Sequence, residues 1–273
     1  MAPGDAQRIG LIAGSGRFPQ LFAEAARARG LSVVAIAHRG DTDPALERSV
    51  SALHWVHLGQ LGRSVAHLRQ AGVSRAVMAG GIGKLSALMR ARPDWGGLAV
   101  AARLRHLGDD HLLRAVAAAF ERGGVRIEPS TLFTPELLAP EGTLSRRAPT
   151  AAEARDVRFG FEVACALGRA DVGQTVVVEN GVVLAVEASE GTDPTLVRGG
   201  DYGRGRAVVV KCAKPGQDLR FDLPAVGART ISLMAAHGCR VLALQAGSAL
   251  MLDGQALLAA ADGAGIAVVG VSP

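Results

Sequence analysis

The sequence predicts an α/β protein in which an N-terminal Rossmann-like parallel sheet domain is followed by a C-terminal mixed α/β domain. Three observations lead to this prediction. In the first half, apolar runs without polar alternation recur between helical patterns, as in a parallel sheet covered on both faces. A glycine-rich turn at residues 14–16 follows the first of these runs. In the second half, Asn180-Gly181 joins two apolar runs, which indicates an antiparallel hairpin.

Composition narrows the classes of protein and partner. The 273 residues are 49% hydrophobic and only 4% aromatic, so small aliphatic side chains must fill the cores of two domains. The formal net charge of +5 suits anionic partners, but no basic run is interleaved with aromatic residues, so we expect no nucleic acid as a partner. Cys165, Cys212 and Cys239 form no C-x-x-C pair, so we expect reduced core thiols rather than a zinc site.

Apolar periodicity places strand–helix–strand units in the first half. Pro19 stands where a helix should begin, because proline fits the first turn, and apolar residues then recur at helical spacing up to Gly30. The expected strands are 9–13, 32–37, 75–80 and 125–129, and the further expected helices are 60–70, 97–107 and 110–122.

The proline-rich stretch after residue 134 is the best candidate for a domain boundary. We therefore expect an N-terminal domain at 1–135, a linker at 136–149 and a C-terminal catalytic domain at 150–273. Thr150 and Glu153 match a capping box, which predicts a helix from there to about residue 167. Beyond it we expect a hairpin at 174–188, strands at 207–211, 240–245 and 266–271, and helices at 226–237 and 254–264.

Gly14, Ser15 and Gly16 supply only part of a dinucleotide-binding fingerprint. The third glycine would fall at position 19, which is proline, and no acidic residue for a ribose ends the next strand. We therefore disfavour NAD, although a turn at the start of a helix can still offer backbone N–H groups to a phosphate. The alternative is that small residues are needed only for a close strand–helix turn.

A second glycine turn contains Gly80, Gly81 and Lys84. It fails the Walker spacing because Leu85 follows the lysine. Two turns at the carboxyl ends of parallel strands should face the same crevice, so Lys84 would bring a cation to a phosphate there. The alternative is a solvated surface lysine.

Asp218, Arg220 and Asp222 alternate along the segment "GQDLRFDLP" and would project to one side if the backbone is extended. Carboxylate oxygens are ligands for Mg²⁺, and arginine holds phosphate oxygens in bidentate fashion. The pattern therefore predicts a metal-and-phosphate site with Asp222 and Asp218 as metal ligands. The alternative is a surface ion-pair ladder with no function.

Two further polar segments follow expected strands in the second half. One follows the hairpin, and the other follows the strand 207–211. They contribute carboxylate, hydroxyl and ammonium groups as candidate substrate-binding residues: Glu187, Glu190, Thr192, Asp193, Lys211 and Lys214.

Five stretches together resemble the LpxI family over nearly the whole chain: "GLIAGSGRFP", "GGIGK", "LGDDHLLRAV", "VVVENGVVLAVEASEGTD" and "VKCAKPGQDLRFDLPAVGARTI". The last two are the specific ones. The resemblance implies a metal-dependent UDP-2,3-diacylglucosamine pyrophosphatase of lipid A biosynthesis, which yields UMP and 2,3-diacylglucosamine 1-phosphate (lipid X). It also implies that the substrate is held between the two domains, and it allows a homodimer.

Carried to this chain, the resemblance makes Asp222 the leading catalytic candidate, with Asp218 and Arg220 beside it. It implies Mg²⁺ or another divalent metal as cofactor, and it implies that the two glycine turns and the remaining polar residues bind the substrate. One departure is Gln245, because the family usually has glutamate there. We therefore leave Gln245 out of the catalytic set.

Two other functions stay open: a non-catalytic protein that binds a nucleotide sugar or lipid, and a Rossmann-type oxidoreductase. The sequence has no signal-peptide core and no run of eighteen apolar residues, so we expect a cytoplasmic protein. A lipid substrate would bring it into peripheral contact with the inner membrane, where its basic balance would help.

Overall fold

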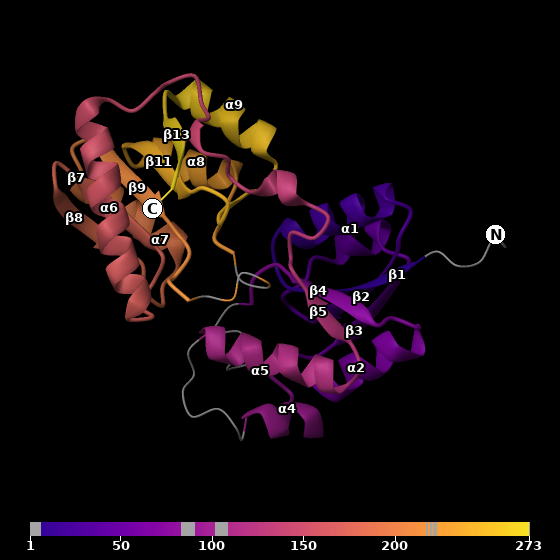
Figure 1. Ribbon diagram of the computed structural model, residues 1–273. Helices are drawn as coiled ribbons and strands as arrows, with labels where there is room; N and C mark the ends of the chain where they lie inside the picture. The colour runs from indigo at the N-terminus through magenta and orange to yellow at the C-terminus, as the bar shows by residue number, and fades with distance from the viewer. Residues whose placement is uncertain are drawn as a thin grey trace. The chain divides into compact units, whose positions relative to one another are not determined.

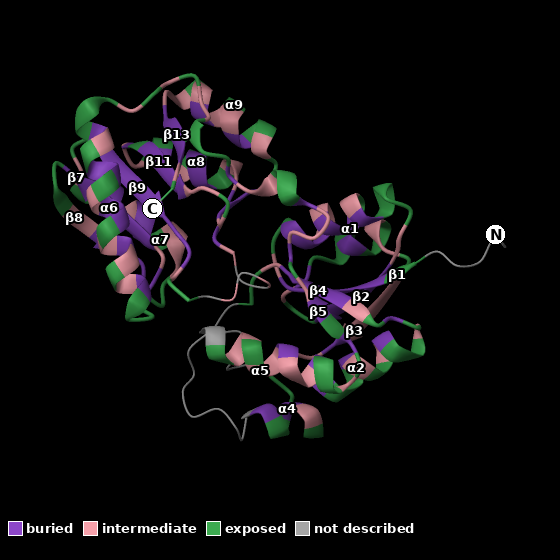
Figure 2. Ribbon diagram, viewed as in Figure 1, coloured by how far each residue is buried: buried purple, intermediate pink, exposed green. Residues whose placement is uncertain are grey.

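The computed structural model describes residues 7–82, 91–101, 109–216, 218, 220 and 223–272, and the chain separates into two compact units. The N-terminal unit comprises the described residues up to Pro135, together with Asp218 and Arg220 from the second half of the sequence. The C-terminal unit comprises the other described residues from Glu136 on. Each unit has its own sheet and its own buried core (Figure 1, Figure 2).

A five-stranded parallel sheet forms the centre of the N-terminal unit, in the order β3-β2-β1-β4-β5, which confirms the predicted parallel sheet. Its strands are β1 (Arg8–Ala13), β2 (Ser32–His38), β3 (Ala52–Val56), β4 (Arg75–Ala79) and β5 (Arg126–Glu128). The helices are α1 (Phe18–Ala28), α2 (Leu61–Gln70), α4 (Trp95–Ala101) and α5 (Asp109–Arg122), with a 3-10 turn η1 (Pro44–Ser49). Helix α1 lies on one face of the sheet, α2 and α5 lie on the other, and α4 packs on α2 and α5 (Figure 1). Because helices cover both faces, β1 and β2 can bury nearly every residue.

Strand β3 is absent from the sequence-based prediction. It is an edge strand, and its residues from Ala52 to Trp55 are only partly buried. It therefore lacks the continuous apolar run that marks β1 and β2. The predicted helix 97–107 is described as α4 up to Ala101, and its remainder lies outside the described residues.

The Asp94 carboxylate holds α4 against α2. Its Oδ2 accepts a hydrogen bond from the Arg63 N–H at 2.9 Å, and its Oδ1 accepts one from the Gly97 N–H at 2.9 Å. One carboxylate thus satisfies the first turns of two helices and meets the positive ends of both helix dipoles. The two helices approach closely, since a Cβ added at Gly97 would lie 2.1 Å from the Gly59 carbonyl oxygen.

We expect Asp94→Ala to lower the free energy of unfolding by about 1–2 kcal/mol, because two helix N-termini lose their acceptor. Burial alone would raise the pKa of Asp94, but the backbone hydrogen bonds outweigh it and hold the pKa below its usual value. A lowered folded-state pKa means that the stabilisation is present above the unfolded-state pKa and is lost as the pH falls through the folded-state pKa. Urea unfolding of both proteins from pH 7 downward tests this: the difference should shrink below pH 4, and equal stability at pH 7 would contradict it.

A six-stranded mixed sheet forms the centre of the C-terminal unit, in the order β6-β13-β11-β9-β7-β8, as predicted for a mixed α/β domain. The three strands β9, β11 and β13 are parallel, and β6, β7 and β8 join them by antiparallel pairing. The strands are β6 (Gly142–Thr143), β7 (Thr175–Glu179), β8 (Val182–Val186), β9 (Ala207–Lys211), β11 (Cys239–Gln245) and β13 (Ala267–Val271), and a separate pair is β10 (Ala225–Val226) with β12 (Leu250–Met251). Helix α6 (Ala151–Arg169) covers one face, and α7 (Thr192–Tyr202), α8 (Ala228–Ala236) and α9 (Gly254–Ala264) cover the other (Figure 1).

Two local predictions are confirmed in this unit. The Thr150 hydroxyl accepts a hydrogen bond from the Glu153 N–H, and the Glu153 carboxylate accepts one from the Thr150 N–H at 2.7 Å, which is the capping box of α6. Asn180 and Gly181 have φ values of 51° and 73°, as a two-residue hairpin turn requires. Their N–H groups each donate to the Asp156 carboxylate at 2.8 Å, which ties the hairpin to α6.

Helix α7 is also absent from the sequence-based prediction, because its Gly199 and Gly200 disfavour a helix. The structure explains both glycines by close packing. A Cβ at Gly199 would lie 2.5 Å from the Cβ of Val177 on β7, and a Cβ at Gly200 would lie 2.2 Å from the His237 carbonyl oxygen. Tertiary packing therefore overrides the low helix propensity of this segment.

The stretch 136–149, expected to form a linker, lies within the C-terminal unit. It contains the end of a 3-10 turn η2 (Pro135–Leu137) and the strand β6, which pairs with β13. Ala139 is fully buried, and the Ser145 hydroxyl accepts a hydrogen bond from the Val268 N–H at 2.7 Å. These contacts dock the stretch against the β13 side of the sheet.

The three cysteines are free thiols, as expected. Cys212 and Cys239 are buried, and burial raises the pKa of each thiol to about 12. Cys165 is only partly buried. The two buried thiols are therefore protonated at neutral pH and behave as small apolar core residues.

Candidate active site

The two glycine turns of the N-terminal unit meet at the carboxyl edge of its sheet. One turn follows β1, and the other follows the neighbouring strand β4. The Ser15 N–H donates to the Gly81 carbonyl at 2.7 Å, and the Gly81 N–H donates to the Ser15 carbonyl at 3.2 Å. The Gly14 N–H donates to the Ala79 carbonyl at 2.8 Å. These bonds join the ends of two strands that are 66 residues apart in the sequence.

This contact accounts for two of the glycines without a ligand. A Cβ at Gly14 would lie 2.5 Å from the Gly81 carbonyl oxygen, and a Cβ at Gly80 would lie 2.4 Å from the Ser15 carbonyl oxygen. The N–H groups of Gly14, Ser15 and Gly81 are engaged in the contact, so a phosphate would have to displace them. Nothing approaches Gly16, whose φ of 88° favours glycine. Phosphate binding by these turns stays a prediction, and Lys84 lies outside the described residues.

His38 ends β2, where a dinucleotide-binding protein would carry an acidic residue for the ribose. Its buried ring has Nδ1 2.9 Å from the Ala13 carbonyl oxygen, which also accepts a hydrogen bond from the Thr42 hydroxyl at 2.7 Å. Burial lowers the pKa of His38, so the ring is neutral at pH 7 and Nδ1–H donates to the carbonyl. His38 and Thr42 therefore fasten the end of β1 just before the first glycine turn. Sequence reasoning did not identify Thr42, since nothing local marks it.

Three buried polar residues form a row across the C-terminal sheet. Thr175 at the start of β7 is paired with Lys211 at the end of β9. On its other side, the Thr175 carbonyl accepts a hydrogen bond from the Glu187 N–H at 2.9 Å. Residues opposed on neighbouring strands point to the same face of a sheet. That face is the one covered by α7, because Val177 and Val209, two residues away on the same strands, belong to the core beneath α7.

Thr192, the first residue of α7, closes this row into a hydrogen-bonded chain. Lys211 Nζ donates to Thr192 Oγ1 at 2.6 Å, and the Thr192 hydroxyl donates to Glu187 Oε1 at 3.0 Å. Lys211 is only 4% exposed and Glu187 only 8%. Two oxygens, Glu187 Oε2 and Thr175 Oγ1, are buried without a hydrogen-bond partner. Because buried polar atoms are nearly always paired, these two oxygens indicate where water or a ligand completes the cluster.

We call Thr175, Glu187, Thr192 and Lys211 the Lys211 cluster. Three of its members were expected from the sequence, and the structure brings them together. Thr175 was not expected, because only the antiparallel register of β7 with β9 places it opposite Lys211. The cluster offers a fixed buried ammonium beside polar oxygens, which is a suitable arrangement for an anionic group.

Glu190 and Asp193 lie in separate ion pairs. Glu190 Oε1 accepts from the Arg198 guanidinium at 2.8 Å, and its Oε2 accepts from the Ala188 N–H at 3.2 Å. Asp193 Oδ2 accepts from the Arg229 Nε at 3.0 Å. Both pairs therefore brace the turn before α7 and its first residues, and neither carboxylate hydrogen-bonds directly to Lys211 Nζ in these contacts.

Lys214 and Gln245 also have structural partners. Lys214 Nζ lies 2.6 Å from Asp171 Oδ1, so its ammonium is directed to the loop after α6. The Gln245 side-chain oxygen accepts a hydrogen bond from the Ala213 N–H at 2.9 Å. An amide oxygen is sufficient for this bond, so the backbone beyond β9 is held without a charge at position 245.

Asp218 and Arg220 form a compact turn within the N-terminal unit rather than an extended ladder. Asp218 Oδ1 accepts from the Arg220 N–H at 3.1 Å, and the guanidinium donates to both carboxylate oxygens, the shortest bond being 2.8 Å. These hydrogen bonds hold the pKa of Asp218 below its usual range. The Arg220 guanidinium also lies 3.3 Å from Glu121, and its carbonyl accepts from the Ser130 N–H at 2.8 Å. Arg220 is thus a cation fixed in place by two carboxylates.

The predicted metal ligands fare differently. Both oxygens of Asp218 are engaged by Arg220, so its carboxylate does not fit a metal ion in this arrangement. Asp222 lies outside the described residues. Among the residues that the structure does describe, no group of three or more His, Cys, Asp or Glu side chains could hold a metal ion.

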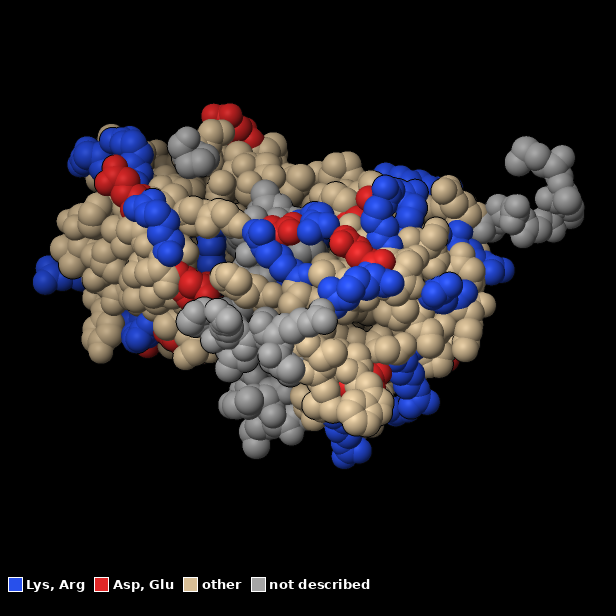
Figure 3. Space-filling model, turned by 60° about the horizontal axis from the view of Figure 1, so that its bottom comes forward, with Lys and Arg blue, Asp and Glu red and all other residues tan. Residues whose placement is uncertain are grey.

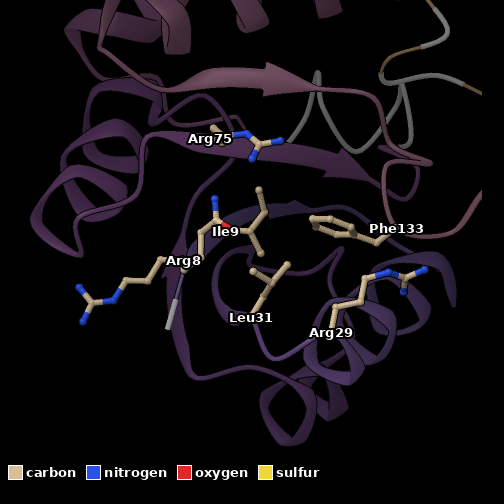
Figure 4. Close-up of a pocket in the computed structure, with 7 residues that line it drawn as sticks. Arg8, Ile9, Arg29, Leu31, Arg75 and Phe133 are labelled. Carbon is tan, nitrogen blue, oxygen red and sulfur yellow. The ribbon is translucent and has the colours of Figure 1, made fainter. Parts of the chain in front are cut away.

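A hollow of about 230 Å³ in the N-terminal unit lies away from all of these groups. It is at the amino edge of the sheet, where β1 and β4 begin, whereas the glycine turns are at the carboxyl edge. Figure 4 shows Ile9, Leu31 and Phe133 facing it, with Arg29 beside the phenylalanine ring at 5.8 Å from its centroid. None of the residues that line the hollow was expected at the site, so it does not mark the chemistry.

Fold and site together define a two-domain α/β protein with a buried cationic cluster at the strand ends of its second domain. A family model described as the LpxI N-terminal domain matches residues 8–137, and one described as the LpxI C-terminal domain matches residues 140–269. The chain belongs to the LpxI family.

One curated relative covers nearly the full length. The protein named UDP-2,3-diacylglucosamine pyrophosphatase LpxI from Caulobacter vibrioides is 38% identical over 280 residues, which span 98% of each chain. Solved structures are much less similar. A precorrin-6A reductase has a TM-score of 0.35 and 13% identity over 98% of this chain and 90% of its own. A leucoanthocyanidin reductase–NADPH complex from Vitis vinifera has a TM-score of 0.29 and 15% identity over 55% of this chain and 41% of its own. At these scores, neither likeness carries a functional argument.

Proposed function

We propose that this chain hydrolyses the pyrophosphate bond of UDP-2,3-diacylglucosamine, giving UMP and 2,3-diacylglucosamine 1-phosphate in lipid A biosynthesis. Membership of the LpxI family and the full-length similarity to a protein of that name support the proposal. The observation that carries it is the Lys211 cluster. A pyrophosphate is densely anionic and its hydrolysis adds further charge, so the enzyme needs a fixed cation where that charge develops.

The side chains of this chain have distinct tasks in the proposal. Lys211, held by Thr192 and through it by Glu187, would steady phosphoryl oxygens without having to reorganise. Arg220, held by Asp218 and Glu121, would supply a second fixed cation that binds phosphate oxygens. Asp218 then acts as a positioning residue for Arg220.

We also propose that the reaction requires a divalent metal, Mg²⁺ or another, with Asp222 as its protein ligand. A bound divalent ion would neutralise charge on the phosphoryl oxygens. The proposal is supported by the sequence resemblance and by the charge of the substrate. Its test is separate from that of the Lys211 cluster.

EDTA is expected to reduce UMP release at least a hundredfold, and an excess of Mg²⁺ is expected to restore it, because the ion supplies much of the charge neutralisation. The measurement is UMP formed from detergent-dispersed UDP-2,3-diacylglucosamine. A control with EDTA already saturated by Ca²⁺ or Zn²⁺ shows whether the identity of the ion matters. Full turnover in EDTA after exhaustive dialysis would exclude a required metal.

The same assay separates the proposal from its two alternatives. A non-catalytic nucleotide-sugar or lipid-binding protein would bind the substrate but release no UMP. A Rossmann-type oxidoreductase would need a ribose-binding acid after β2, where this chain has the neutral, buried His38. Hydrolase chemistry is favoured because the Lys211 cluster supplies charge for a phosphoryl group and nothing specific for a nicotinamide.

The substrate's acyl chains also suggest where the protein works. In the described part of the chain, no helix combines the length and the hydrophobicity needed to cross a membrane. We propose peripheral contact with the cytoplasmic face of the inner membrane, because the lipid substrate resides there. A homodimer is a further proposal, and light scattering during size-exclusion chromatography would test it, since a monomer mass at micromolar concentration would exclude it.

A further inference from the structure

Helix α4 presents large apolar side chains to solvent. Trp95 is 87% exposed and Leu98 is 46% exposed, and these are two of the few large hydrophobic side chains outside the cores of the described residues. The helix is firmly attached, since Asp94 joins it to α2 and Gly97 lies against Gly59. Exposed apolar groups on a fixed element indicate a contact surface rather than a loose end.

The sequence around α4 is strongly basic. Residues 48–108 contain nine Lys or Arg and a single acidic residue, Asp94, although the whole chain has 30 basic and 25 acidic residues. That carboxylate is engaged by backbone N–H groups of α2 and α4. Arg63 and Arg92 are exposed beside the helix: the Arg63 N–H donates to Asp94, and the Arg92 N–H donates to the Leu58 carbonyl at 2.8 Å.

We define the α4 face as Arg63, Arg92, Trp95 and Leu98. Figure 3, in which the bottom of Figure 1 comes forward, shows basic side chains beside uncharged surface at the lower end of the N-terminal unit. An exposed tryptophan with a neighbouring leucine, flanked by arginines, has the composition of a surface that lies in the interfacial layer of a bilayer.

We propose that the α4 face docks on an anionic lipid bilayer. Trp95 and Leu98 enter the boundary between headgroups and acyl chains, and Arg63 and Arg92 meet lipid phosphates. A second copy of the chain fits this face less well, because a symmetric contact would bring like-charged arginines together. The proposal gives a location to the membrane contact of the proposed function, and it rests on that function only for its biological purpose.

Tryptophan fluorescence tests the docking directly. The chain has two tryptophans, so Trp55→Phe leaves Trp95 as the sole reporter. Vesicles of phosphatidylethanolamine with phosphatidylglycerol should shift its emission to the blue, and vesicles of phosphatidylcholine alone should leave it unchanged. Because the arginine contribution is electrostatic, 0.5 M NaCl should weaken binding to the anionic vesicles.

Vesicle sedimentation supplies the quantitative arm. Trp95→Ser, and separately the pair Arg63→Ser with Arg92→Ser, should each lower the partition coefficient about tenfold. Tyr202→Ser is the matched control, because Tyr202 is 72% exposed but lies in the C-terminal unit. Thermal unfolding of each variant should match the wild type, since these side chains are at the surface.

The two levels of the proposal fail in different ways. Unchanged Trp95 emission, or equal partitioning of Trp95→Ser and the wild type, would overturn the docking surface. The variants should still release UMP from detergent-dispersed substrate at the wild-type rate. If the wild type itself releases no UMP, the proposed reaction is wrong, while the vesicle result is unaffected.

Discussion

Lys211→Met is expected to lower kcat for UMP release about a hundredfold to a thousandfold, whereas Lys214→Met should stay within about threefold of the wild type. The two lysines are three residues apart, and both were candidates from the sequence. Lys211 Nζ is buried in the cluster with Thr192 and Glu187, at the end of a strand. Lys214 Nζ pairs with Asp171 in the loop that follows α6.

The reason for the difference is preorganisation. An ammonium that the fold already holds in a buried site stabilises new negative charge without the cost of ordering it, and low polarity around it strengthens the effect. Methionine keeps most of the lysine's length and apolar stem, so the change removes charge with little loss of packing. Equal activity of the two variants would show that the Lys211 cluster is not where the pyrophosphate is bound.

A positioning test extends this prediction to Glu187. Glu187→Gln keeps the side-chain shape and the acceptor for Thr192 but removes the charge behind Lys211. It should reduce kcat less than Lys211→Met does, and a pH–rate profile shifted from that of the wild type would separate positioning from simple loss of structure. A profile identical to that of the wild type, with equal kcat, would remove Glu187 from the site.

Gly80→Ala is expected to lower the free energy of unfolding of the N-terminal unit by about 3 kcal/mol or more. The new Cβ would lie 2.4 Å from the Ser15 carbonyl oxygen, and the residue would keep a φ of 88°, which L-residues rarely adopt. Backbone atoms cannot yield as a flexible side chain does, so the two turns must separate and their shared hydrogen bonds must break.

Gly16→Ala is the matched control, because Gly16 has the same φ of 88° and no atom within 4 Å of an added Cβ. It should cost only about 1–2 kcal/mol, the price of the backbone conformation alone. Urea unfolding of both variants measures the difference. If the two glycine variants are equally stable, the contact between the turns is looser than the structure indicates.

Local sequence signals anticipated much of the fold. Continuous apolar runs predicted β1, β2 and β4, because a strand covered on both faces needs no polar alternation. Asn180-Gly181 predicted a hairpin and Thr150 with Glu153 predicted a helix start, since each depends on residues only a few positions apart. Signals of this kind act within one turn or one element, so no knowledge of distant partners is needed.

The candidate site depended on partners that are distant in the sequence. The sequence drew attention to Lys211 and Lys214 alike, but the register of β9 on β7 directs the first into a buried cluster, and the loop after α6 takes the second. It could not identify Thr175, or show that the Asp218 carboxylate is occupied by Arg220. By itself, therefore, the sequence determined the family, the α/β class and the kinds of side chain available. Only the tertiary structure decided which of them share a site, because strand register and helix packing bring together residues that no local signal links.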